Sequence, residues 1–132
     1  MTHPTADVLR NAVSGIPDIA VAFVYGSVAR GDADDQSDCD LFVLTVPGTS
    51  VEGNHAVVRA LAVQNVEISR AIGRELSLVV YRTEDLRRRL ADVPGGFVDR
   101  VLSGPKIFVL GTAEDLQGLT SAAPRVYGAL NA

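Results

Sequence analysis

Cysteine is nearly absent from this chain of 132 residues, which contains only Cys39. A single cysteine excludes an intramolecular disulfide and a metal cage built from several thiolates, and it fits a reducing, cytoplasmic compartment. No apolar stretch reaches the ~20 residues that a membrane-spanning helix needs. The first residues also lack a basic region followed by an apolar run, so we expect neither a signal peptide nor a membrane partner.

The chain also has no excess of positive charge, and it contains few aromatic residues. The net charge is −4, aromatic residues make up 5% of the chain, and there is no tryptophan. Proteins that bind nucleic acid through its phosphates usually have a basic surface, so direct nucleic-acid binding is not expected. The short arginine cluster at 87–89 is typical of a solvated helix face. With so few aromatic residues, the core must consist mainly of Val, Leu, Ile and Ala.

Segments rich in apolar residues alternate with segments of helical spacing. Strands are predicted over 19–25, 39–46, 75–81 and 106–111, the last at a sheet edge because Pro105 precedes it. Helices are predicted over 5–14, 54–73, 84–91 and 96–103, with a last one from the cap at Thr112 to Leu119 and a short turn or helix after Gly26. Thr5 is the expected cap of the first helix.

This alternation predicts one layered domain over residues 1–132, with residues 120–132 as a tail that frays. The fold class is α/β (α+β), with a mixed sheet of about four strands flanked by helices. We expect the helices mainly on one face of the sheet, which leaves the face with the aspartates open.

The residues that carry chemistry lie between two predicted strands. Asp38 and Asp40 alternate on one strand face, about 6.5–7 Å apart along the backbone, and repel each other unless a cation lies between them. Magnesium prefers such hard oxygen ligands, together with substrate phosphates and water. Gly26 lets the backbone approach a ligand closely, and Ser27 supplies a hydroxyl to a phosphate. Arg30, one helical turn later, either contacts the same phosphates or forms a salt bridge with the acidic loop.

The segment FVYGSVARGDADDQSDCDLFVL, residues 23–44, closely resembles the signature of the DNA polymerase beta-like nucleotidyltransferase superfamily. That signature is Gly-Ser, ten residues, then Asp-x-Asp. The fuller form of small bacterial members, GSxARG followed by SDxDL, also matches, and it adds Ser37 to the nucleotide-binding set. The resemblance implies a fold that binds a nucleoside triphosphate, ATP above all, with Mg²⁺ or Mn²⁺. It further implies transfer of AMP to a hydroxyl on a protein, an RNA end or a small molecule.

The resemblance continues through IGRELSLVVYRTEDLRRRL and LSGPKIFVLG, residues 72–90 and 102–111. These segments are similar to a bacterial group in which a minimal nucleotidyltransferase domain is often joined to a winged-helix domain. Small proteins of this kind are often antitoxins of helical HEPN-type toxins. A HEPN-type toxin or a winged-helix regulator is therefore the protein partner that the resemblance implies.

One position departs from the family pattern. Active members usually place a third carboxylate on the third strand, where this chain has Ser77. Glu75 lies two residues earlier on the same strand face and is the candidate replacement among the catalytic residues, beside Asp38 and Asp40. Two readings stay open: an enzyme in which Glu75 completes the site, or a degenerate nucleotide-binding or antitoxin-like module without turnover.

Overall fold

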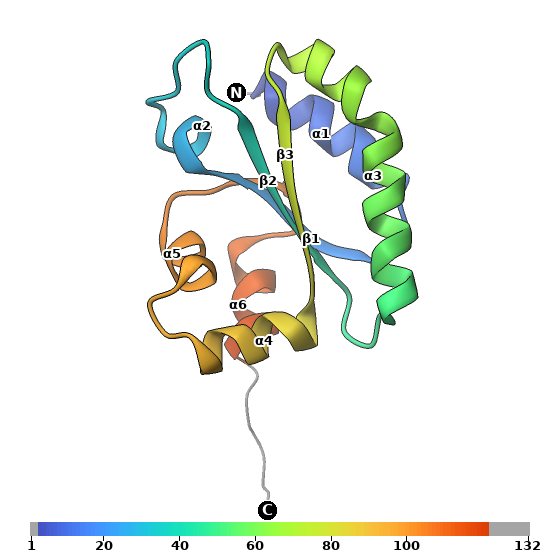
Figure 1. The fold of residues 1–132 in the computed structure, drawn as a ribbon, viewed down its shortest axis with the longest axis vertical. Helices are drawn as coiled ribbons and strands as arrows, with labels where there is room; N and C mark the ends of the chain where they lie inside the picture. The colour runs from blue at the N-terminus through green and yellow to red at the C-terminus, as the bar shows by residue number, and fades with distance from the viewer. Residues whose placement is uncertain (1–2, 122–132) are drawn as a thin grey trace, which may run out of the picture.

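The computed structural model describes residues 3–121. The elements along the chain are α1 (Pro4–Ser14), β1 (Ile19–Tyr25), α2 (Gly26–Arg30), β2 (Cys39–Thr45), α3 (Val51–Ile72), β3 (Leu76–Arg82), α4 (Thr83–Asp92), α5 (Phe97–Ser103), β4 (Ile107–Leu110) and α6 (Ala113–Ser121) (Figure 1). Helix α6 runs two residues beyond its predicted end at Leu119. The rest of the predicted tail, from residue 122 onward, lies outside the described residues.

The four strands form one mixed sheet in the order β3-β2-β1-β4. Strand β1 runs antiparallel to both β2 and β4, whereas β2 and β3 are parallel. The two central strands are those with the most continuous apolar sequence. The short strand β4 lies at an edge, as Pro105 predicted. The α/β fold class and the mixed four-stranded sheet are therefore confirmed.

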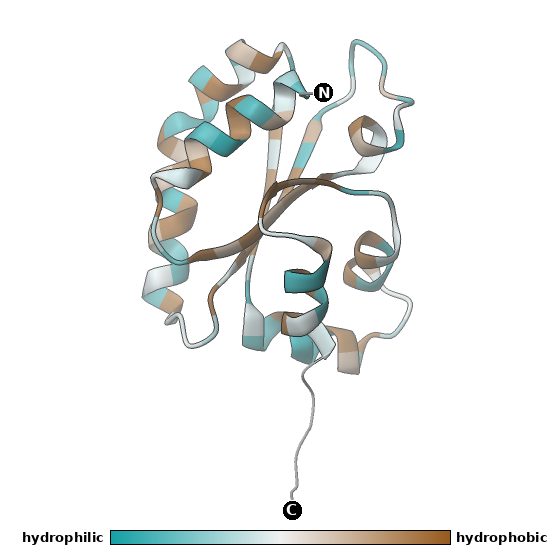
Figure 2. Ribbon diagram, turned by 180° about the vertical axis from the view of Figure 1, so that it is seen from behind, coloured by the Kyte–Doolittle hydropathy of each residue, from teal (hydrophilic) through white to brown (hydrophobic). Residues whose placement is uncertain are grey.

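Helices cover both faces of the sheet, so the expectation that they lie mainly on one face is wrong. One core packs α1 and α3 against residues such as Val24 and Leu41. The other packs α4, α5 and α6 against Phe23 and Phe42. The strands form an apolar band between the two helical layers (Figure 2). Because β1 and β2 are apolar at nearly every position, neither of their faces can be left to water.

Aromatic rings gather on the face that carries α4, α5 and α6. Tyr81, Phe42, Phe23 and Phe108 form a row across all four strands, with ring centroids 5.6, 5.1 and 5.7 Å apart in that order. Tyr25 lies beside this row, 6.1 Å from the ring of Phe42. Ring pairs at these separations stabilise a core beyond the area they bury. The row thus places a layer of rings next to Tyr25, at the end of β1.

The first helix begins one residue before its predicted start. His3, rather than Thr5, is its N-cap: Nδ1 of His3 accepts a hydrogen bond from the backbone N–H of Ala6 (3.2 Å). Pro4 then occupies the first helical position, where its missing N–H costs nothing. Within the described residues, no helix is long and apolar enough to cross a membrane.

Candidate active site

The turn after β1 packs directly against a carboxylate of β2. Tyr25, the last residue of β1, pairs with Asp40 in the antiparallel register. Gly26 follows with φ of +72°, and a Cβ on this residue would overlap Oδ2 of Asp40. Only glycine reaches this backbone conformation at little cost and also leaves room for the carboxylate. The Gly-Ser turn and the aspartates, twelve residues apart in sequence, therefore meet at adjoining strand ends.

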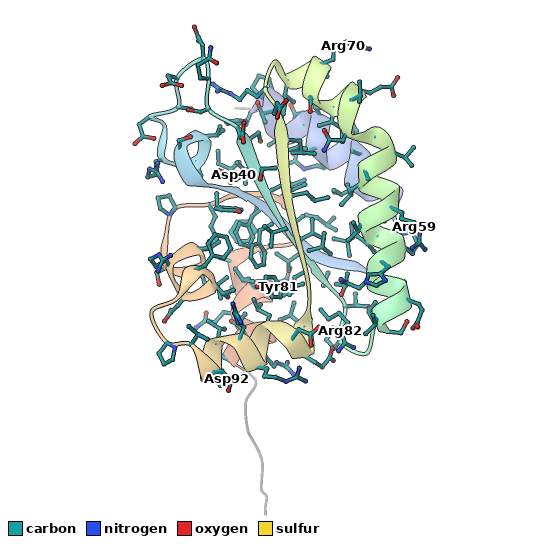
Figure 3. The ribbon with its side chains drawn as sticks, viewed as in Figure 1. Asp40, Arg59, Arg70, Tyr81, Arg82 and Asp92 are labelled. Carbon is teal, nitrogen blue, oxygen red and sulfur yellow. The ribbon has the colours of Figure 1, made fainter. Side chains whose placement is uncertain are left out.

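The two aspartates differ in environment. Asp38 precedes β2 and is exposed, whereas Asp40 is half-buried. Figure 3 shows Asp40 on strand β2. Burial raises the pKa of Asp40, and the negative charge of Asp38 raises it further, while Arg30 opposes both. The charge of Asp38 thus disfavours the ionised form of Asp40, and a cation bound by both carboxylates would relieve this repulsion. As donors, they fit magnesium, which binds one or two carboxylates and completes its shell with phosphate oxygens and water.

Tyr25 lies beside the candidate site, because it is the register partner of Asp40. Its ring packs edge-on against Phe97, with centroids 6.1 Å apart. Burial, and secondarily the charge of Asp40, raise the pKa of its hydroxyl to about 12. The phenol therefore stays protonated at neutral pH and contributes no charge to the site.

Strand β3 places a serine beside the aspartates. In the parallel pairing, Asp40 is the direct register partner of Ser77, so the two side chains emerge on the same face. Glu75 is exposed and lies just before β3, where its carbonyl accepts a hydrogen bond from the N–H of Cys39 (2.8 Å). Across residues 3–121, no group of three His, Cys, Asp or Glu side chains is close enough to hold a metal ion. The candidate site therefore has two neighbouring carboxylates, those of Asp38 and Asp40, and no third acidic, histidine or cysteine side chain among the described residues.

The other predicted nucleotide contacts lie on α2 and the loop after it. Ser27 is half-buried in the first turn of α2, and its carbonyl accepts from the N–H groups of Gly31 and Asp32. Arg30 forms an ion pair with Asp32 at 3.3 Å, with both side chains more than half exposed. An exposed pair of this kind contributes little, so Arg30 can exchange Asp32 for a phosphate at low cost.

Ser37 has a local role in shaping the loop. Its hydroxyl donates to Oδ1 of Asp34 (3.1 Å) and accepts from the N–H of Asp34 (3.1 Å). The same Oδ1 accepts from the N–H of Gln36 (2.9 Å). Hydrogen bonds from Gln36 and then Ser37 lower the pKa of Asp34. These bonds build a tight Asx turn before the strand.

A family model described as "Polymerase beta, Nucleotidyltransferase" matches residues 8–104. The chain belongs to this nucleotidyltransferase family. No match is found among curated proteins.

Several solved structures resemble this nucleotidyltransferase chain. A toxin–antitoxin with AMP-PNP is 13% identical, and the match covers 88% of this chain and 81% of that one with a TM-score of 0.53. A mutant of the toxin–antitoxin MntA–HpeT is 11% identical over 88% and 80% of the two chains, with a TM-score of 0.50. An AMPylated HEPN toxin of Shewanella oneidensis in complex with MNT antitoxin is 13% identical over 89% and 77%, with a TM-score of 0.47. At these identities, the first two similarities show a shared fold.

One residue that shapes the nucleotidyltransferase site was not predicted from the sequence. Arg74, between α3 and β3, donates from Nη1 to the carbonyl oxygens of Asp34 (2.6 Å) and Ser37 (2.9 Å). It therefore ties the loop before Asp38 to the start of β3. Its partners lie 40 and 37 residues away in sequence, and no local pattern marks such a contact.

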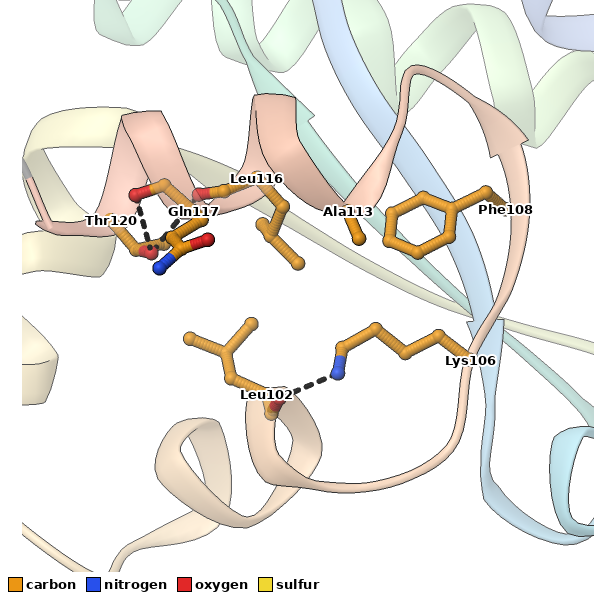
Figure 4. A pocket seen from close by; sticks show the side chains of 7 residues that line it. All are labelled: Leu102, Lys106, Phe108, Ala113, Leu116, Gln117 and Thr120. Carbon is orange, nitrogen blue, oxygen red and sulfur yellow. Dashed lines mark hydrogen bonds between the residues drawn. The ribbon is translucent and has the colours of Figure 1, made fainter.

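A cavity of about 410 Å³ elsewhere in the nucleotidyltransferase domain has a different character (Figure 4). It lies between α5, β4 and α6 and is lined mostly by apolar side chains, Leu102, Phe108 and Leu116 among them. Nζ of Lys106 donates to the carbonyls of Leu102 and Gly104, and burial lowers its pKa. The ammonium group thus satisfies carbonyls at the end of α5. The cavity shares no lining residue with the Gly26–Asp40 pair.

Proposed function

We propose that this chain binds a magnesium-bound nucleoside triphosphate, ATP, and transfers AMP to a hydroxyl acceptor. The observation that carries the proposal is the packing of Gly26 against Asp40. A turn with no side chain, directly beside a half-buried carboxylate, lets a phosphate chain approach the backbone and the carboxylate together. Family membership makes nucleotidyl transfer the general chemistry to which this geometry contributes.

The roles of the residues follow from their positions. Asp38 and Asp40 would hold Mg²⁺, or Mn²⁺ in its place. When bound, the metal neutralises phosphate charge and orients the α-phosphate. Ser27 donates its hydroxyl to a phosphate oxygen, and Arg30 adds a charge-assisted hydrogen bond. The acceptor hydroxyl loses its proton to solvent, and its oxygen bonds to the α-phosphorus as the bond to pyrophosphate breaks. Positioning and charge neutralisation supply most of the catalysis.

The preference for ATP and for a protein partner draws on the toxin–antitoxin structure with AMP-PNP. AMP-PNP is an analogue of ATP, and a chain of that toxin–antitoxin structure shares the fold of this chain. We therefore propose ATP as the nucleotide, a HEPN-type toxin or a winged-helix regulator as the partner, and the cytoplasm as the location. Direct nucleic-acid binding and a membrane partner are not part of the proposal.

A second candidate function is a nucleotide-binding partner module without turnover. The pairing of Ser77 with Asp40 favours it, because serine at this position supplies no carboxylate. In that case the domain would bind the nucleotide and a protein partner, as an antitoxin-like regulator.

One assay separates the two candidates. The protein is incubated with α-labelled nucleoside triphosphates, Mg²⁺ or Mn²⁺, and a candidate partner, and transfer of label is followed. If Glu75 completes the site, Glu75→Gln should lower turnover by a large factor and weaken nucleotide binding much less. If the chain is a degenerate binder, Glu75→Gln should change nothing, and Ser77→Asp should raise or create activity.

Calorimetry with ATP and Mg²⁺ tests the binding step that both candidates share. A wild-type chain that binds no nucleotide under these conditions would contradict both of them.

A further inference from the structure

A hollow of about 350 Å³ lies beside the Gly-Ser turn, on the side where α5 packs. It is bounded by residues from the end of β1, from α2, and from α5 with the loop after it, among them Tyr25, Gly26, Arg30 and Arg100. Gly26 both lines this hollow and packs against Asp40. The hollow is thus continuous with the proposed nucleotide site, through the residue that the phosphate chain would approach.

Charge is distributed unevenly around Gly26. Asp40 contacts this glycine and Asp38 lies beside Asp40, whereas neither aspartate lines the hollow. The two charged side chains that do line it are both guanidinium groups, Arg30 from α2 and Arg100 from α5. The turn at Gly26 therefore has the two carboxylates on one side and the two guanidinium groups on the other. A polyphosphate chain laid across Gly26 has one favoured direction in such a field.

Arg100 has donors available for a ligand. Its Nη1 donates to the carbonyl oxygen of Gly95 (3.0 Å), which fixes the side chain at the loop before α5. Among the described residues, no acidic side chain forms an ion pair with it. Val98 and Val101, on the inner face of α5, are buried and anchor the helix to the sheet. An arginine that is held at one donor and is otherwise exposed is well suited to phosphate.

We propose that Arg100, together with Arg30, binds the β- and γ-phosphates of the nucleoside triphosphate in this hollow. The inference rests on the proposed function and adds to it a phosphate-binding residue on α5, Arg100. The α-phosphate lies at Asp38 and Asp40, and the pyrophosphoryl portion extends over Gly26 toward α5. When the bond from the α-phosphorus to the bridging oxygen breaks, its electron pair stays on pyrophosphate, and the two guanidinium groups stabilise the added charge.

The test compares binding of ATP and of AMP, each with Mg²⁺, by competition against a fluorescent ATP analogue. Arg100→Gln removes the charge and keeps most of the length of the side chain. Arg59→Gln is the matched control, because Arg59 is exposed on α3, away from this face (Figure 3). We expect Arg100→Gln to weaken ATP about tenfold, as for one lost hydrogen bond to a charged group. AMP should stay within about twofold, and Arg59→Gln should change neither ligand.

A second variant and a second ligand separate a phosphate-binding role of Arg100 from a structural one. Arg100→Lys keeps a positive charge and should retain most of the ATP affinity, which provides a second variant if Arg100→Gln is poorly folded. Inorganic pyrophosphate should also displace the ATP analogue from the wild type. Equal weakening of ATP and AMP in Arg100→Gln would indicate a structural role and overturn the inference, as would unchanged ATP binding. A wild type that binds no ATP would instead refute the proposed function, and the inference with it.

Discussion

Replacement of Gly26 by alanine is the sharpest perturbation of the proposed site. The residue has φ of +72°, and the new Cβ would overlap Oδ2 of Asp40. The atom that would be overlapped is at the far end of the Asp40 side chain. This side chain can rotate away, so strand β2 need not unfold. We therefore expect Gly26→Ala to fold, with Asp40 displaced from the position in which it would hold Mg²⁺.

Two costs add up in this variant. A non-glycine residue in the left-handed region costs about 1–2 kcal/mol. Moving Asp40 off its preferred rotamer costs a further ~0.5–1.5 kcal/mol. At about 4 °C per kcal/mol for a domain of this size, the melting temperature should fall by roughly 6–14 °C.

Gly31→Ala is the matched control for this prediction. Gly31 also has a positive φ, of +84°, but a Cβ there would meet nothing within 4 Å. Gly31→Ala should lose only the stability that the backbone conformation costs, and it should keep Mg²⁺-dependent ATP binding. Gly26→Ala should lose this binding. Thermal unfolding and calorimetric titration of both variants with ATP and Mg²⁺ measure the two effects. Equal ATP affinity in Gly26→Ala and Gly31→Ala would refute the reasoning.

Three further predictions concern the site and its surroundings. Asp38→Asn combined with Asp40→Asn should abolish Mg²⁺-dependent ATP binding in calorimetry. It should not lower stability without metal, because unit charges ~7 Å apart in a medium of ε ~80 repel by about 0.6 kcal/mol. Arg74→Gln should cost about 1–2 kcal/mol and speed amide exchange over residues 34–38; unchanged exchange would show that the loop does not depend on it. A hydrogen bond from Arg82 lowers the pKa of Asp85 below its usual 3.8. The ionised Asp85 therefore stabilises the fold above pH 3.8, and this stabilisation is lost as the pH falls through the pKa that Asp85 has in the folded protein. Asp85→Asn should therefore lower stability by about 0.5 kcal/mol at pH 7 and by nothing in strong acid, as denaturant titrations at both pH values would reveal.

The sequence was informative wherever the signal is local. Continuous apolar runs predicted the strands, and the spacing from Gly26 to Asp38 matched the signature of the family. The alternation of Asp38 and Asp40 on one face follows from strand geometry alone. Such features depend on a few consecutive residues and need no knowledge of the rest of the chain.

Contacts between segments distant in the sequence could not be predicted from local patterns. The bonds from Arg74 to the loop carbonyls, and the placement of Arg100 beside Gly26, depend on how α3 and α5 pack against the sheet. The helices were expected mainly on one face, although the apolar character of both faces of β1 and β2 already argued against it. His3 replaced Thr5 as a cap because Pro4 is well placed at the first helical position.

The register of β3 sharpens the choice between the two candidate functions. Ser77 is the residue that pairs with Asp40, and neighbouring strands lie about 4.8 Å apart, so a carboxylate at position 77 would stand beside the aspartate pair. Glu75 starts about 6.5–7 Å farther along the strand, and one additional methylene spans only part of that gap. It also lies outside β3 and is exposed. For Glu75 to complete the site, the bound nucleotide would have to draw it inward. The position of Glu75 and the pairing of Ser77 with Asp40 therefore favour the candidate function without efficient transfer. Robust wild-type transfer that collapses in Glu75→Gln would contradict this reasoning.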